Sequence, residues 1–137
     1  MSRRYDGFTL IESLVAMGLV VTVALGSAQL FSVAIARNLH AREQLVMSLL
    51  AAAKVNDLAA AAADGTIALS PPESLERTSD GCADTPVDEG GRPYVRRWRV
   101  SRVAGFGDEA VAIAVRVTPA AGAGEVRIAT IREWWRP

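Results

Sequence analysis

A long uncharged segment near the amino terminus constrains this chain more than any other feature. From Ser13 to Ala36 every residue is uncharged, and most are Ala, Val, Leu or Ile. About 20 apolar residues are enough to cross the hydrocarbon core of a bilayer. The run is longer than the apolar core of a secretory signal peptide, and no small-residue cleavage site closes it before Arg37. We therefore predict a membrane helix that stays in the mature protein.

Composition and charge exclude several classes of function. Fifteen Lys and Arg residues balance fifteen Asp and Glu residues, so the chain as a whole has no field that would attract nucleic acid or an anionic membrane. One Cys and one His cannot form an intrachain disulfide or a zinc site of Cys and His ligands. No catalytic motif is found in the sequence. We expect no enzyme activity, no cofactor and no metal.

The residues that precede the apolar run form a specific motif. A short basic leader, MSRRYDG, is followed by Phe-Thr-Leu-Ile-Glu, which places Glu12 at the edge of the hydrocarbon. A charged side chain within a membrane helix costs roughly 2.5 to 3.5 kcal/mol on insertion scales, so it indicates a functional role. Gly7, Phe8, Glu12 and the apolar run together resemble the type III signal of type IV pilins and pseudopilins.

The resemblance implies how the chain is processed and assembled. Prepilin peptidase would cleave between Gly7 and Phe8 and methylate the new amino group of Phe8. The carboxylate of Glu12 would then pair with the terminal amine of a neighbouring subunit and set the axial register. The implied partners are the peptidase, other pilins or pseudopilins in a hetero-oligomeric filament or tip complex, and an inner-membrane assembly platform. The amino terminus would be cytoplasmic and the carboxy-terminal domain periplasmic.

Helical signals continue beyond the apolar run. No Gly or Pro occurs between Arg37 and Ala63, and Asp64-Gly65 is a plausible helix end. A single helix from about Phe8 to Asp64 would be about 85 Å long, far longer than a bilayer needs. We therefore expect a leader at 1–7, a transmembrane and assembly helix at 8–36 and a periplasmic globular domain at 37–137.

The second half of the chain changes to the pattern of a sheet. A connecting region at 66–93 is rich in Pro, Gly and acidic residues, with one short helical turn near 71–77. Alternating β-branched and aromatic residues then predict three antiparallel strands at 94–103, 110–118 and 125–132. A long amino-terminal helix with this three-stranded sheet packed on its second half is an α+β architecture. It is similar to the pilin fold.

Short length, a small sheet and no disulfide resemble minor pilins of the PilV kind, or the GspI-like pseudopilin of type II secretion, better than a major pilin. The resemblance implies a subunit of a tip complex that primes filament assembly.

A second function remains open. Arg96, Arg97, Trp98 and Arg99 lie in one predicted strand, where cations could meet phosphates and the indole could stack on a base, as in a DNA-uptake pilin. The competing interpretation is that these arginines line an exposed strand and pair with the acidic connecting region. The zero net charge favours that interpretation, so we do not expect a nucleic-acid partner.

Overall fold

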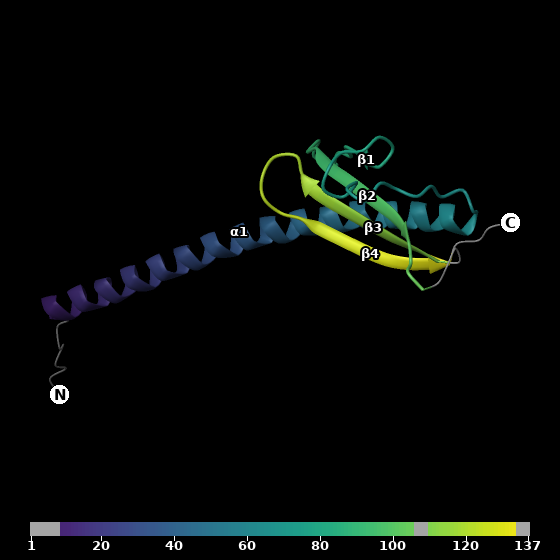
Figure 1. The fold of residues 1–137 in the computed structure, drawn as a ribbon. Coiled ribbons are helices and arrows are strands. Elements are labelled where there is room, and N and C mark those ends of the chain that lie inside the picture. Colours follow the sequence, from purple (N-terminus) through teal and green to yellow (C-terminus); the bar gives the residue numbers. More distant parts are fainter. Residues whose placement is uncertain (1–8, 106–109, 134–137) are drawn as a thin grey trace, which may run out of the picture. The chain divides into compact units, whose positions relative to one another are not determined.

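The computed structural model describes residues 9–105 and 110–133, which form one long helix and a four-stranded sheet (Figure 1). Helix α1 spans Leu10–Ala63, and the strands are β1 (Ala83–Asp84), β2 (Tyr94–Arg102), β3 (Ala110–Pro119) and β4 (Val126–Glu133). The chain divides into two units with the boundary between His40 and Ala41. The α+β class predicted from the sequence is confirmed.

Both ends of α1 are capped by local signals in the sequence. At the start, the backbone N–H of Glu12 donates to the Thr9 hydroxyl over 3.4 Å, so Thr9 acts as the N-cap. At the end, Gly65 has a φ of 69°, a left-handed conformation that a residue without Cβ adopts readily. The N–H groups of Thr66 and Gly65 donate back to the carbonyls of Ala61 and Ala62. This paired arrangement is a Schellman motif, which explains why the helix ends at Ala63.

The sheet is an antiparallel meander in the order β1-β2-β3-β4. Because side chains alternate across a strand, one face of the sheet is apolar and covers the second part of α1. The core combines the helix residues Met47, Ala51, Val55 and Ala62 with the strand residues Tyr94, Trp98, Val100, Val111, Ile113, Val115 and Val117. Ala51 and Ala62 of α1 are completely buried in this core.

The sheet differs from the prediction by one strand. The three long strands begin and end within one residue of the predicted limits, but β1 was predicted as part of the connecting region. It consists of Ala83 and Asp84, which pair with Arg97 and Arg96 of β2. Neither residue type favours strands, so this strand exists because β2 offers it a partner edge.

The connecting segment before β1 folds back on the sheet. Its predicted helical turn is a hydrogen-bonded turn at 72–76 rather than a helix, and Ser74 and Leu75 within it are fully buried. Further back, the backbone N–H of Ser70 donates to the carbonyl of Val100, and the Val100 N–H donates to the Ser70 hydroxyl. These bonds occupy the outer edge of β2 at Val100, beyond the residues Arg96 and Arg97 that pair with β1.

Candidate functional site: the amino-terminal segment and the arginine-rich strand

Of the residues predicted to take part in processing and assembly, Glu12 is the one that the structure describes. Gly7 and Phe8 lie outside the described residues. Glu12 is exposed in the first turn of α1, three residues after the Thr9 cap. A carboxylate there is favoured by the partial positive charge of the helix amino terminus. The position leaves its side chain accessible to a neighbouring molecule.

The first part of α1 has the surface that a bilayer requires. All residues from Leu10 to His40 are exposed, and they include many large apolar side chains. Within the described residues, α1 is the one helix long and apolar enough to cross a membrane. The hydroxyls of Thr22 and Ser27 donate to the carbonyls of Gly18 and Val23, so these polar groups are satisfied inside the helix.

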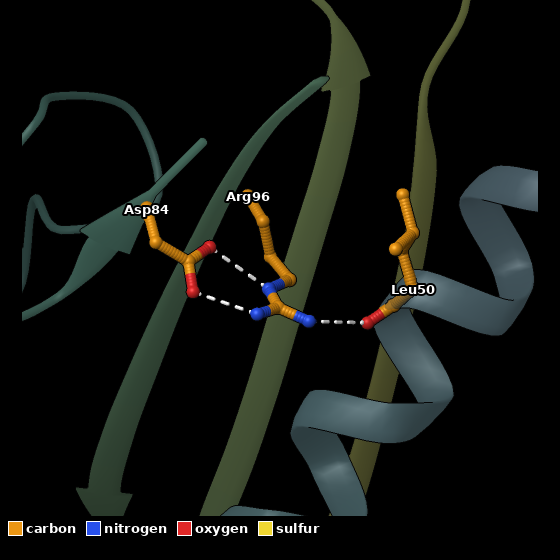
Figure 2. A network of polar contacts seen from close by, with 3 residues as sticks. All are labelled: Leu50, Asp84 and Arg96. Atoms are coloured by element: carbon orange, nitrogen blue, oxygen red, sulfur yellow. Dashed lines mark hydrogen bonds and ion pairs between the residues drawn. The ribbon is translucent and has the colours of Figure 1, made fainter. Parts of the chain in front are cut away.

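Arg96 on β2 connects three elements (Figure 2). Its Nε and Nη2 donate to the two carboxylate oxygens of Asp84 on β1, at 2.9 and 2.6 Å. Its Nη1 donates to the backbone carbonyl of Leu50 on α1 over 2.9 Å. The Arg96 side chain is only 13% exposed. A two-pronged guanidinium–carboxylate contact of this kind is among the stronger ion pairs in proteins, so Arg96 has a structural role.

Trp98, two residues further along β2, faces the same side. Its ring is buried in the core, and the ammonium of Lys54 on α1 lies 3.8 Å from the ring centroid. Such a cation–π contact stabilises both groups where they are partly desolvated. Because Lys54 and the core cover this ring, it does not form an exposed platform on which a base could stack.

Arg97 and Arg99 lie on the opposite face of β2 from Arg96 and Trp98. Arg97 Nη2 approaches the Thr78 hydroxyl at 3.5 Å, and Arg99 Nη1 donates to the carbonyl of Pro72 over 3.1 Å. The structure therefore separates the four residues of the predicted nucleic-acid contact into two pairs on different faces. In the competing interpretation the arginines line an exposed strand and pair with the acidic connecting region: the pairing holds for Arg96 with Asp84, but Arg96, Arg97 and Arg99 are half-buried rather than exposed.

Tyr94 begins β2 and is almost completely buried. Burial raises the pKa of its phenol above the ordinary value, because the phenolate would be poorly solvated. The negative charges of Asp88 and Glu43 raise this pKa further, and Arg92 opposes them. Tyr94 thus stays a neutral hydrogen-bonding group over the physiological pH range.

Two partners of this strand were not predicted individually. Asp84 was one of several acids in the connecting region, and nothing in the sequence distinguishes it from its neighbours Asp80 and Asp88. The Leu50 carbonyl belongs to a regular helix and has no sequence signal at all. Across residues 9–105 and 110–133, no group of three or more His, Cys, Asp or Glu side chains is arranged to hold a metal ion.

Comparison with known families agrees with the amino-terminal motif. Residues 2–28 match the family described as the prokaryotic N-terminal methylation motif. The chain therefore carries a type IV pilin-like prepilin signal. That signal supports a pilin-like or pseudopilin-type protein, which implies processing by prepilin peptidase and assembly with other pilins. No curated protein and no solved structure matches the chain significantly.

Proposed function

We propose that the chain is a minor pilin or minor pseudopilin of a type IV pilus or type II secretion filament, acting in a tip or priming complex. The observation that carries the proposal is the methylation motif at residues 2–28 leading into one continuous helix. That helix exposes apolar residues along its first part and contributes one face to the core of a small α+β domain in its second.

Each segment then has a separate task. Residues 1–7 are the leader that prepilin peptidase removes, and residues 8–36 anchor the subunit in the inner membrane and later pack among neighbouring helices. Residues 37–137 form the periplasmic domain, which determines the contacts of this subunit with others. The division agrees with the composition, because the uncharged run ends at Ala36.

Glu12 would guide the entry of the subunit into a filament. An exposed carboxylate in the first helical turn can meet the methylated amine of Phe8 on a neighbouring subunit. Two opposite charges that leave water together lose hydration, and their mutual attraction offsets this cost only when they meet in good geometry. A subunit out of register would leave both charges unpaired in an apolar environment.

Intact-mass measurement of the chain produced with and without prepilin peptidase tests the processing step. We expect the loss of residues 1–7 and the gain of one methyl group. Gly7→Val should block cleavage, because its side chain would occupy space that the peptidase needs. Gly18→Val is the matched control, since nothing lies within 4 Å of a Cβ at that position. An uncut chain in the presence of active peptidase would contradict the proposal.

The assembly step needs a separate readout. Glu12→Ala should be cleaved normally but recovered poorly in sheared or cross-linked filament complexes, because the partner amine stays unpaired. Removing one member of a buried ion pair typically costs about 3 to 5 kcal/mol. Glu12→Gln keeps the shape and loses the charge, so its recovery should be intermediate. Normal incorporation of Glu12→Ala would show that this acid does not set the register.

A further inference from the structure

Three arginines form a row across the face of the sheet that points away from α1. Arg97 of β2 is the register partner of Arg116 of β3, and Arg116 is the register partner of Arg127 of β4. Their neighbours Val115, Val117 and Val126 belong to the core or pack against it, so the arginines lie on the other face. With strands about 4.8 Å apart, the row extends about 10 Å from Arg97 to Arg127.

Repulsion among these three like charges lowers the stability of the isolated domain. Like charges directly opposite each other on neighbouring strands are destabilising. Among the described residues, the carboxylate that forms an ion pair with the row is Glu125, which accepts from Arg116 Nη2 over 2.7 Å. Arg97 Nε and Arg116 Nε are buried and donate no hydrogen bond. Three arginines in the row thus share one ion-paired carboxylate among the described residues.

The two ends of the row differ in how accessible they are to a ligand from solvent. The turn at 72–76 lies over the β2 end and the middle of the row, since Arg99 Nη1 on β2 donates to the carbonyl of Pro72 and Arg116 Nη1 on β3 donates to that of Leu75. At the β4 end, Arg127 is exposed, and the Arg116 side chain is 28% exposed. An anionic group can therefore approach from the β4 side and reach Arg127 and Arg116 first.

We propose that the row formed by Arg97, Arg116 and Arg127 binds an acidic segment of a partner protein, through two carboxylates. An extended segment with acids at alternate positions places its carboxylates about 7 Å apart on one side, which fits a row of this length. Guanidinium groups bind carboxylates with paired, charge-assisted hydrogen bonds. This site does not depend on processing or on membrane insertion.

Acids around the row favour a short acidic segment over a nucleic acid. Glu73 and Glu76 are exposed in the turn whose carbonyls accept from Arg99 and Arg116, and Glu125 pairs with the row itself. A phosphate backbone is a continuous line of negative charge and would meet these carboxylates on either side of the row. A protein segment can place its acids at the row and neutral residues beside it.

Binding of a labelled peptide of alternating Asp and Thr to the detergent-solubilised full chain, followed by fluorescence anisotropy, tests the proposal. Arg127→Gln and Arg97→Gln should each weaken binding by at least about tenfold, the loss expected for one charge-assisted hydrogen bond. Arg132→Gln is the matched control. It removes the same charge from an exposed site on β4, but its register partner Val111 is a core residue, so it lies on the other face. Binding should change less than about twofold.

Thermal unfolding distinguishes a lost contact from a lost fold. Because Arg127→Gln removes a like-charge neighbour of Arg116, we expect its Tm to be equal to or above that of the unchanged chain. Equal weakening by Arg127→Gln and Arg132→Gln would overturn the proposal, as would a peptide Kd above about 1 mM. A DNA duplex that binds more tightly than the peptide, with the same dependence on Arg127, would also overturn it and assign the row to nucleic acid.

Discussion

At the scale of single residues, the strand from Tyr94 to Arg102 shows how one sequence pattern serves three purposes. Tyr94, Trp98 and Val100 fill the core, Arg96 joins the sheet to the helix, and the arginines on the other face lie beneath or beside the connecting segment. The alternation of faces follows from the sequence. The buried position of Arg96 does not, because it depends on Asp84 and on a backbone carbonyl of α1 that are distant in the chain.

Replacement of Arg96 tests its structural role. Arg96→Gln loses the charge and most of the contacts with Asp84, so we expect the free energy of unfolding to fall by about 1.5 to 3 kcal/mol. Asp84 is 37% exposed and can regain water, which favours the lower part of that range. Urea unfolding measures the change. Arg132→Gln on β4 should alter stability by less than about 0.5 kcal/mol, and an equal effect of both changes would contradict this role.

The phenol of Tyr94 provides a pH-dependent readout of the same strand. In a fragment covering 41–137 it is the single tyrosine, because the other is Tyr5. Its raised pKa means that the folded state keeps the proton at a pH where the unfolded state loses it. Stability from this group is therefore full below pH 10.0 and declines as the pH rises through the folded pKa. The titration of tyrosinate absorbance should have its midpoint above 10.0.

Replacement of Asp88 tests why the pKa of Tyr94 is raised. Asp88→Asn removes a negative charge that raises the pKa, so the midpoint should move down yet stay above the ordinary value, since burial is the larger cause. A midpoint at or below 10.0 in the unchanged fragment would show that Tyr94 is solvated in solution.

At the scale of elements, the sequence predicts the helix and the three long strands, which have a periodic pattern, and misses β1, which forms only because β2 pairs with it. The uninterrupted helix and the alternation in β2, β3 and β4 are local signals, and the structure places these elements within about two residues of the expected limits. Strand β1 has no alternation to detect, because it is two residues long. The row of arginines was also missed, since register across three strands cannot be read from any one of them.

Substitution on α1 tests how closely the helix packs against the sheet. Ala51 is completely buried, so Ala51→Leu should force the sheet away from the helix and lower the free energy of unfolding by about 1 to 3 kcal/mol. Ala53→Leu makes the same change at an exposed position of the same helix and should be nearly neutral. Denaturant unfolding of both variants gives the comparison. Similar losses at the two positions would mean that helix packing is not the cause.

At the scale of the whole molecule, the two parts of α1 belong to different environments. The part up to His40 has no buried residues, whereas Met47 is the first residue of the helix in the core. A fragment covering 41–137 keeps the whole core cluster and omits the membrane-spanning run. We expect it to be soluble and folded, with helix and strand signals in circular dichroism.

A shorter fragment serves as the control. A chain beginning at Lys54 lacks Met47 and Ala51, so the core would be exposed at one end. It should unfold at a clearly lower temperature or aggregate. Aggregation of the longer fragment as well would show that the globular part needs the first part of the helix.

The meander order of the sheet has a consequence for the moment when a new subunit folds. Each strand pairs with the strand that precedes it, so every pairing closes a short stretch of chain. Folds dominated by such local pairings have low contact order and tend to fold quickly. In a subunit anchored in a membrane, the sheet would thus form early, and it would then cover the apolar face at Met47 and Val55 by packing on α1. A sheet that is already complete can cover that face in one packing step, which shortens the time in which neighbouring subunits can aggregate through it.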